Sequence, residues 1–413
     1  MNTERLPVVG NGVDHTRLQT LGHRIEQFLA TGMLPYWVRN GWETASGGLH
    51  ERLDSDGRPI ILGYRRLTTI ARQLFVFSRG ARDFPTAASA DSAHRCYAEL
   101  LRGFRDTRHG GWYFKLDLDG SPIDRTKDLY ASAFVVFGLT EYASIFGVPQ
   151  AAELAVETLA LLHKKLFQTD GWLAPAATED WRPLDRSLQA NPHMHLLEAA
   201  VSSHSLTGAD AARQLIDRIA ELYEQRLIDR RTGTLREFFD NAGQPHPQDG
   251  HIREPGHHFE WYWIIHQLPD ERRKMELANI SETMFAWGRR HGIDSRNGGI
   301  FDQVDEKGSV LRETKRLWAM TEGVKAFAAA YRIRQDPDDL RQLATLVEFL
   351  FDAYLRPDGT WIEILNRDLS PFQTWMPPTT CYHLYLGLSE AVRLIDDLPR
   401  TPLNDDIHEL ERR

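Results

Sequence analysis

The sequence predicts an all-α protein, an (α/α)6 toroid of six helical hairpins with short β-hairpins between the units. Three observations predict this fold: a glycine-led phrase that recurs along almost the whole chain, helical periodicity between its copies, and end units that lack a polar capping face. Repeats bury apolar faces against their neighbours, so a row without capped ends is expected to close into a ring. Although 413 residues suggest two or three domains, we therefore expect one domain over residues 15–400, with terminal tails at 1–14 and 401–413.

The recurring phrase is a glycine followed by alternating aromatic or apolar residues and then, usually, an acidic or glycine-containing turn. Its six copies begin at Gly47, Gly110, Gly171, Gly233, Gly298 and Gly359, at intervals of 61 to 65 residues. In the second copy, residues 112–118 alternate and are followed by Asp119-Gly120, a pattern typical of a β-hairpin. The third and sixth copies lack the turn glycine and therefore match the phrase less well.

The segments between these phrases have helical periodicity, with apolar residues at i, i+3 and i+4. Each unit holds two such stretches, as in LYASAFVVFGLTEYASIFG over 129–147 and AAELAVETLALLHKKLF over 151–167. The first stretch is apolar nearly all round and predicts an inner helix, whereas the second is amphipathic and predicts an outer helix. Six units supply about twelve helices.

Each predicted inner helix carries one polar or aromatic residue near its start, 20 to 25 positions after the preceding phrase glycine. These residues are Arg72, Tyr130, His195, His257, Trp318 and His383. In a closed ring, matched offsets place side chains at a similar height around one axis. A helix cap or a solvated first turn explains any one of them, but explains six together poorly. We therefore expect an axial pocket for a polar, uncharged or anionic small ligand.

The residue types in this layer favour acid/base chemistry without a metal. Histidine is the side chain whose ordinary pKa lies nearest neutral pH. His193 and His195 are two positions apart, and His257 and His258 are adjacent, so neither pair shares a helix face. The sequence has no HExxH, paired CxxC, GxSxG, GxGxxG or GxxxxGKS motif, so we expect no metal site, no serine triad and no cofactor.

Aromatic residues and two long loops point to the same pocket. Tryptophans in predicted hairpins, loops or inner-helix starts are Trp112, Trp172, Trp181, Trp318 and Trp375, where a flat ring can stack on a sugar. Core packing explains Trp261 and Trp287 equally well. The loops at 174–192 and 241–255 lead into the predicted pocket and are candidate lids.

The composition is that of a globular protein, with 42% hydrophobic and 26% charged residues. A net charge of −9 argues against nucleic acid or anionic membrane as a partner. No run approaches the roughly 18 apolar residues of a membrane span, and the first residues do not resemble a secretory signal. Cys96 and Cys381 are too few for a disulfide framework. We expect a cytoplasmic monomer or homodimer.

Segments in all six units, within residues 21–394, resemble the N-acylglucosamine 2-epimerase superfamily. They are ARQLF from Ala71, DLYASAF from Asp128, NPHMHLLEA from Asn191, EPGHHFEWYWII from Glu254, KRLWAMTEG from Lys315 and CYHLYLG from Cys381. The resemblance implies an (α/α)6 barrel of a sugar epimerase or ketose–aldose isomerase that needs no metal. Glu-Pro-Gly-His followed by Phe-Glu-Trp looks most like the mannose isomerase and sulfoquinovose isomerase branch. Tyr262 and the extra histidines His193 and His258 depart from the expected pattern.

The resemblance also implies roles for individual residues. His257 and His383 would be the acid/base pair. The residues that would bind sugar hydroxyls or orient these histidines are Arg72, Tyr130, Asn191, His195, Glu260, Trp318, Glu322 and Trp375. We expect His257 to open the sugar ring, with Glu260 one helical turn away orienting its imidazole. We expect His383 to take the C2 proton, and Arg72 and His195 to stabilise the oxyanion.

The leading expectation is a metal-independent aldose–ketose isomerase that interconverts D-mannose and D-fructose through an enediolate. A 2-epimerase of mannose/glucose or cellobiose type is the nearest alternative. A sulfoquinovose isomerase would need basic residues at the rim, for which Arg182, Arg186 and Arg253 are candidates. More distant alternatives are an inverting glycoside hydrolase and a sugar-binding regulator without activity. The hydrolase would use two carboxylates among Asp128, Glu260 and Glu322.

Overall fold

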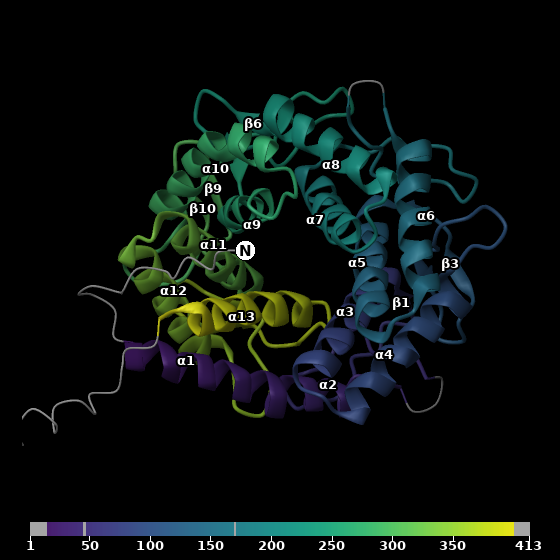
Figure 1. The fold of residues 1–413 in the computed structure, drawn as a ribbon, viewed down its shortest axis with the longest axis horizontal. Coiled ribbons are helices and arrows are strands. Elements are labelled where there is room, and N and C mark those ends of the chain that lie inside the picture. Colours follow the sequence, from purple (N-terminus) through teal and green to yellow (C-terminus); the bar gives the residue numbers. More distant parts are fainter. Residues whose placement is uncertain (1–14, 44–46, 169–170, 400–413) are drawn as a thin grey trace, which may run out of the picture.

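The computed structural model describes residues 15–43, 47–168 and 171–399 and confirms the (α/α)6 architecture (Figure 1). Six inner helices surround the barrel axis: α3 (Leu67–Asp83), α5 (Leu129–Phe146), α7 (Ala190–Thr207), α9 (Pro255–Ile265), α11 (Leu317–Arg334) and α13 (Thr380–Asp397). A single domain over residues 15–400 stays a prediction, and the predicted tails lie outside the described residues.

The outer ring surrounds these helices (Figure 1). It consists of α4 (Ala87–Glu99), α6 (Pro149–Leu166), α8 (Asp210–Leu222), α10 (Glu271–Gly292), α12 (Pro337–Phe349), and of α1 (His15–Gln27) and α2 (Leu34–Asn40). The π-helical turn η1 (Phe28–Met33) joins α1 to α2, and η2 (Leu100–Phe104), η3 (Tyr223–Leu227) and η4 (Leu350–Tyr354) extend α4, α8 and α12.

The two rings differ in burial as their sequences predict. Helix α5 is capped by Asp128, whose carboxylate accepts the Ala131 N–H at 2.8 Å, and it ends at Gly147 in the left-handed conformation. Among the described residues, α5 is the one helix that is long and apolar enough to cross a membrane. However, 78% of its residues are buried inside the barrel, as its inner position requires.

The ring closes where α13 packs against α3 and where α1 packs against α13 and α12. Arg72 of α3 donates a hydrogen bond to the Thr379 carbonyl at 3.1 Å, and Arg17 of α1 forms a bidentate ion pair with Glu348 of α12. The first helix of the described chain is therefore the outer partner of the last. The predicted order of inner helix, outer helix and hairpin holds for the other units.

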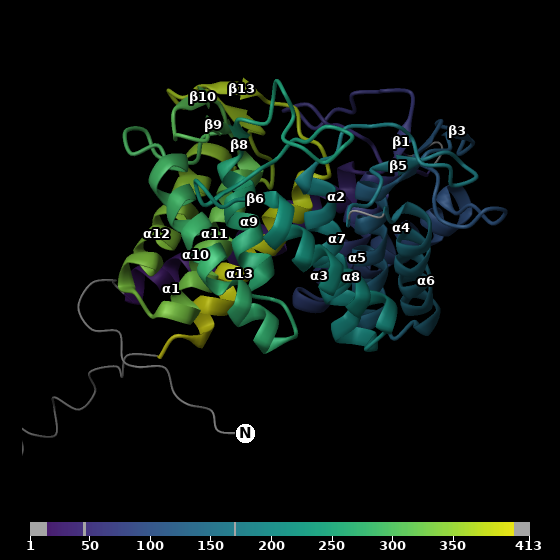
Figure 2. The ribbon, with the colours of Figure 1, turned by 90° about the horizontal axis from the view of Figure 1, so that it is seen from above.

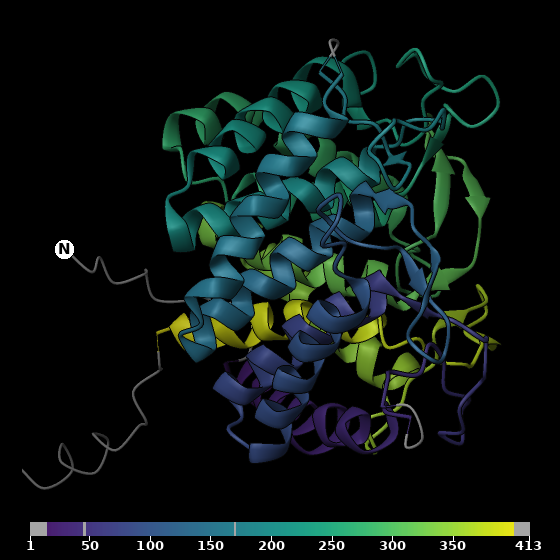
Figure 3. The same cartoon turned by 90° about the vertical axis from the view of Figure 1, so that its right-hand side faces the viewer.

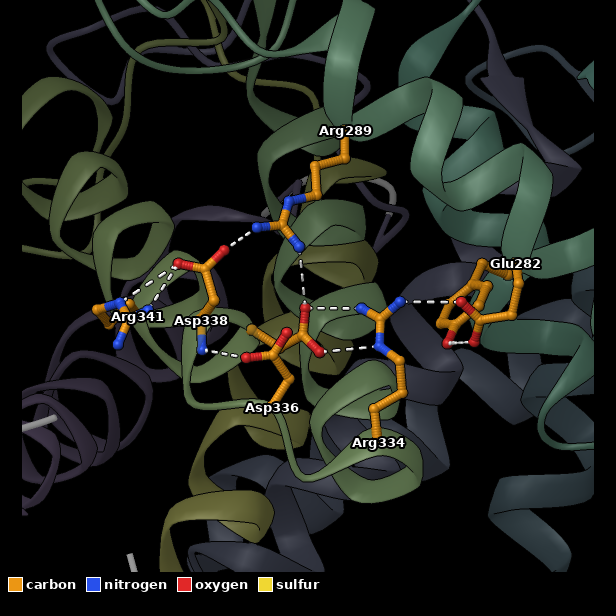
Figure 4. Close-up of polar contacts among 8 residues, drawn as sticks. Glu282, Arg289, Arg334, Asp336, Asp338 and Arg341 are labelled. Atoms are coloured by element: carbon orange, nitrogen blue, oxygen red, sulfur yellow. Dashed lines mark hydrogen bonds and ion pairs between the residues drawn. The ribbon is translucent and has the colours of Figure 1, made fainter. Parts of the chain in front are cut away.

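Charged side chains connect the inner and outer rings around α11 (Figure 4). Arg334 at the end of α11 binds Glu282 of α10 at 2.9 Å and Asp339 of α12 at 2.7 Å. Glu282 also accepts a hydrogen bond from the Tyr262 hydroxyl at 2.6 Å. Tyr262 stacks on Phe285 of α10, with the ring centroids 4.4 Å apart. The tyrosine that departs from the expected pattern thus packs between α9 and α10.

Short antiparallel strands gather at one end of the barrel (Figures 2 and 3). Three sheets have three strands: β1 (Arg65–Arg66), β2 (Lys115–Leu116) and β3 (Pro122–Asp124); β8 (Ile252–Arg253), β9 (Gln303–Asp305) and β10 (Val310–Arg312); β11 (Lys315–Arg316), β12 (Ile364–Leu365) and β13 (Pro371–Gln373). Two sheets have two strands: β4 (Lys127–Asp128) with β5 (Ala176–Ala177), and β6 (Ile228–Asp229) with β7 (Thr234–Leu235). In four sheets, the strand that leads into an inner helix pairs with the next glycine phrase. This pairing fixes the starts of the inner helices at a common level.

The turns of the six phrases share one geometry, including the two that lack glycine. In each turn, the N–H of the residue with positive φ donates to the carbonyl three residues earlier. These residues are Gly57, Gly120, Trp181, Gly243, Gly308 and Leu369. Trp181 has φ 68° and Leu369 has φ 69°, a conformation that costs a non-glycine residue roughly 1–2 kcal/mol. The third and sixth copies therefore form the same turn at a local cost.

His193 and His258 hold two glycine phrases against the inner helices. Both are buried. The Nδ1 of His193 donates to the Gln189 carbonyl at 2.9 Å, and its Nε2 accepts the Leu173 N–H at 3.1 Å. His258 makes the same two bonds one unit later, to Glu254 and Leu235. These histidines are structural, because both ring nitrogens are already bound.

Methionine sulfurs accept the corresponding backbone N–H in the last two units. The N–H groups of Ile300 and Trp361, each two residues after a phrase glycine, lie 3.2 Å from the sulfurs of Met320 and Met376. Leu173 and Leu235 occupy the equivalent position in their own phrases. One backbone N–H in each of four units is therefore accepted by a buried imidazole or thioether.

This arrangement predicts a loss of stability in acid. Burial lowers the pKa of His258 to about 3, whereas the unfolded chain protonates near pH 6.5, so the unfolding free energy falls as the pH drops below 6.5. His258 alone should lower the unfolding free energy by about 2 kcal/mol between pH 7 and pH 5. We expect His258→Met, which copies the later units, to reduce the loss by that amount in urea unfolding at the two pH values. His251→Met, in an exposed loop, is the control, and an equal loss in both variants would contradict the assignment.

Candidate active site

The six residues at matched offsets line one cavity of about 190 Å³ on the barrel axis, at the strand end. Asn191 and Glu260 also line it. The cavity is smaller than the roughly 300–1,000 Å³ of sites for drug-sized ligands, and its wall consists mainly of charged and hydrogen-bonding side chains. The predicted convergence on a small polar pocket is therefore confirmed. Wall residues that the sequence analysis did not single out are Glu254, Arg316, Glu363, Pro377, Thr379 and Thr380.

Two of the predicted site residues are not in this wall. Glu322 lies behind His383 and contacts its Nδ1, as an orienting residue would. The ring of Trp375 lies against the guanidinium of Arg52, 3.9 Å from it, and is not among the cavity-lining residues. Trp375 follows β13, and the packing on Arg52 holds it away from the axial wall.

His257 is the charged histidine of the site. Its Nδ1 lies 3.0 Å from Glu237 Oε2 and 3.5 Å from Glu254 Oε2. Burial alone would lower the pKa of His257, but the carboxylates, Glu237 first, outweigh it and raise the pKa to about 9. His257 is thus an imidazolium at neutral pH. The expectation that Glu260 orients this ring is wrong, because the bond to Nδ1 comes from Glu237.

Glu237 could have been found from the repeat. It lies four residues after the phrase glycine Gly233. The acids at the same position in other phrases are Glu51, Asp302 and Glu363. Each accepts hydrogen bonds from residues at the start of the inner helix that follows, for example Glu51 from the backbone N–H of Arg66 and Asp302 from that of Arg316. A recurring acid at this offset indicates a carboxylate beneath the starts of four of the six inner helices.

His383 and His195 are the neutral histidines of the site. The Nδ1 of His383 lies 2.8 Å from Glu322 Oε1, and that of His195 lies 3.3 Å from Glu198 Oε2. Burial lowers the pKa of His195 to about 4. Burial, reinforced by the charges of Arg72 and Lys325, holds the pKa of His383 well below its ordinary value. An ionised carboxylate only accepts hydrogen bonds, so Nδ1 of each ring donates and Nε2 has a free lone pair.

Arg72 supplies a positive charge to the wall. Its guanidinium donates to the Tyr130 hydroxyl at 2.6 Å and lies 3.9 Å from the centre of the Phe134 ring. Within the described residues, no carboxylate forms an ion pair with it. A buried arginine without a carboxylate partner suits an anion or a developing oxyanion in the cavity.

A cluster of titratable residues lies at and beneath the cavity wall. Two overlapping sets of close side chains could each hold a metal ion: His195, Glu198 and Glu260, and Glu260, Glu322 and His383. Lys325 already places an ammonium group among them, 2.5 Å from Glu322 and 3.9 Å from Glu260. The ammonium group of Lys325 therefore supplies a positive charge between these carboxylates.

A vestibule of about 520 Å³ shares Arg72, Tyr130, Asn191 and Thr379 with the axial cavity. Of the three rim arginines, Arg186 lines this vestibule, from the loop at 174–192. Arg253 instead is buried against Thr234 and Asp229, and Arg182 pairs with Asp180 in the same loop. Asn241 of the second long loop bonds to Asp185, so the two loops are joined; a lid role stays a prediction.

The candidate stacking tryptophans other than Trp375 fall into two groups, one that lines the cavity and one that is buried elsewhere. Trp318 lines the cavity, with its ring 5.0 Å from that of His257 and 5.8 Å from that of His383. The others named above from the hairpins, Trp112, Trp172 and Trp181, are buried. Of the candidate stacking residues, Trp318 is thus the one that the structure places in the wall.

The barrel resembles those of solved sugar epimerases and isomerases. A cellobiose 2-epimerase from Spirochaeta thermophila has the same fold, with a TM-score of 0.82 at 24% identity over 92% of this chain and 98% of that chain. The chain belongs to the N-acylglucosamine 2-epimerase (GlcNAc 2-epimerase) family, whose model matches residues 47–387. The resemblance seen in the sequence is confirmed.

Two relatives are similar in sequence. A mannose-6-phosphate isomerase from Rhizobium meliloti is 31% identical over 379 residues, which are 88% of this chain and 94% of that protein. A D-mannose isomerase from Thermobifida fusca is 26% identical over 328 residues, 75% of this chain and 78% of that protein.

The environment of His257 predicts the effect of removing one carboxylate. In Glu237→Gln, the pKa of His257 should fall from about 9 toward the ordinary value near 6.5, because burial is then less opposed. An NMR titration of histidine ring signals measures this. Glu51→Gln changes the equivalent acid of the first phrase and should leave the titration of His257 unchanged. An unchanged pKa in Glu237→Gln would show that Glu237 does not set the charge of His257.

Proposed function

We propose that this protein is a metal-independent aldose–ketose isomerase that interconverts D-mannose and D-fructose. The observation that carries the proposal is that one small polar cavity is faced by a protonated His257 and a neutral His383. Environments that push the pKa values of two titratable groups apart assign the acid and the base. The remaining proposals from the sequence, a cytoplasmic location and a monomeric or homodimeric state without cofactor, stay predictions.

Ring opening is the first step. It needs a proton delivered to the ring oxygen and another removed from the anomeric hydroxyl. The imidazolium of His257 delivers the first proton, and the resulting neutral ring accepts the second. Glu237 and Glu254 stabilise the charged state to which His257 returns.

Proton transfer between C2 and C1 is the second step. The Nε2 of His383 takes the C2 proton, which is acidic because the adjacent carbonyl stabilises the enediolate, and returns it to C1. The hydroxyl proton passes from O2 to O1 in the same step, so that the carbonyl moves from C1 to C2. Arg72 stabilises the negative charge, a contribution typically of about 3–4 kcal/mol per donor. The neutral state of His195 changes the role that we expected for it. Its free Nε2 suits it to accept a hydrogen bond from a substrate hydroxyl rather than to stabilise the oxyanion.

The substrate proposal is supported by cavity size and by relatives. The axial cavity of about 190 Å³ suits a single small polar ligand. The Rhizobium meliloti and Thermobifida fusca relatives are named as mannose-6-phosphate and D-mannose isomerases. An anionic group at C6, as in a phosphorylated or sulfonated sugar, would extend toward the vestibule that Arg186 lines.

A 2-epimerase is the second candidate. The vestibule of about 520 Å³ leaves room for a second sugar beyond the reducing end, and relatives from Dictyoglomus turgidum and Bacteroides fragilis are named cellobiose 2-epimerases. Reprotonation of the enediolate at C2 from the opposite face would give the epimer.

The glycoside hydrolase alternative is less well supported. Atoms of Glu260 and Glu322 lie within 4.8 Å of each other and of His383. An inverting enzyme needs carboxyl groups about 6.5–9.5 Å apart, flanking the bond. The third candidate acid, Asp128, caps α5.

Turnover in heavy water tests the reaction. With mannose, the proposal predicts activity that survives exhaustive chelation and fructose that carries deuterium at C1 to the extent that the proton on His383 exchanges with solvent before its return; glucose as the product would favour the epimerase. His383→Ala should abolish C2 exchange while sugar binding remains, and near-normal exchange would place the base elsewhere.

His257→Ala should retain more activity on sugar that is already open, and an equal loss on closed and open sugar would contradict its ring-opening role.

The pH dependence of kcat/KM tests the acid. The rate should be constant around neutrality and decline as the pH rises through about 9, because His257 then loses its proton. Glu237→Gln should move this decline to lower pH. A wild-type decline near pH 7, or none up to pH 10, would contradict the assignment.

A further inference from the structure

Lys325 of α11 lies below the axial cavity, among the carboxylates that contact the neutral histidines. Its side chain is fully buried. The ammonium group lies 2.5 Å from Glu322 Oε2 and 3.9 Å from Glu260 Oε1, and 4.3 Å from the centre of the Trp263 ring. Glu198 of α7 also raises the pKa of Lys325, which therefore keeps its charge.

The carboxyl groups around Lys325 lie close enough to disfavour one another's ionisation. Burial and the neighbouring Glu322 and Glu198 hold the pKa of Glu260 well above its ordinary value, which favours its protonated form. The hydrogen bond from His195 and the charge of Lys325 outweigh burial and lower the pKa of Glu198. Lys325 therefore neutralises chiefly Glu322, its nearest carboxylate.

The charge of Lys325 reaches His383 through Glu322. One oxygen of Glu322 contacts Lys325, and the other lies 2.8 Å from His383 Nδ1. Burial raises the pKa of Glu322, and the ammonium group opposes that rise. An ionised Glu322 can only accept, which requires hydrogen on Nδ1 and leaves the Nε2 lone pair free. A protonated Glu322 would donate to Nδ1 and favour hydrogen on Nε2.

We propose that Lys325 is a positioning residue for His383. Its ammonium group takes the place that a metal cation would have between Glu260 and Glu322, keeps Glu322 an acceptor, and so fixes the tautomer whose Nε2 can act as a base. The proposal deepens the proposed function and rests on it, since the base role of His383 was assigned there.

The tautomer of His383 can be measured without turnover, by NMR of protein labelled with 15N in histidine. The His383 signals are assigned by their absence in His383→Gln. In the wild-type protein we expect hydrogen on Nδ1. In Lys325→Met, which keeps the length of the side chain and removes its charge, we expect hydrogen on Nε2 and a fall in kcat of about a hundredfold, with KM little changed.

Two further variants separate charge from packing. Lys325→Arg keeps the positive charge and should keep hydrogen on Nδ1 even if its Tm falls. Lys127→Met is a matched control, because Lys127 and Asp106 form another fully buried ion pair, with 2.6 Å between Nζ and Oδ2. It should leave the His383 tautomer unchanged and keep kcat near the wild-type value.

Each outcome decides the proposal. Hydrogen on Nε2 in the wild-type protein would overturn it even if Lys325→Met does not fold. Hydrogen on Nδ1 in a folded Lys325→Met would also overturn it, whatever the rate. A changed tautomer with an unchanged rate would support the effect of Lys325 on the ring but would remove His383 as the base, and with it the proposed mechanism.

Discussion

The seam between α3 and α13 turns six similar units into a ring with a centre. Arg72 and Gln73 of α3 donate hydrogen bonds to the carbonyls of Thr379 and Pro378, at 3.1 and 2.7 Å, across more than 300 residues of sequence. Arg72 is also part of the cavity wall. Closure and site are therefore built from the same contacts, and only closure brings His383 beside residues of the first three units.

The site uses one side-chain type in three environments. His257 faces two carboxylates from the hairpin end and is charged, whereas burial keeps His195 and His383 neutral. The difference comes from the backing residues, since all three rings line the same cavity. A layer of histidines can thus hold an acid and a base that face one cavity.

The repeat was sufficient to predict the ring and the six wall residues, because both depend on spacing alone. The partner of each wall residue depends on side-chain direction and strand register, which spacing does not fix. Glu260 lies one turn from His257 yet contacts the cluster around Lys325, and the bond to His257 comes from Glu237. Trp112 belongs to the alternating apolar residues of its hairpin and packs inside the protein, so it is buried instead of reaching a ligand.

The backbone N–H groups that fix the glycine phrases are accepted by imidazoles in the third and fourth units and by thioethers in the fifth and sixth. Oxidation of Met320 or Met376 to the sulfoxide would enlarge and polarise a buried anchor. The barrel therefore has two arcs with different chemical vulnerabilities: protons loosen one, and peroxide would loosen the other. Neither stress acts on both arcs through these anchors.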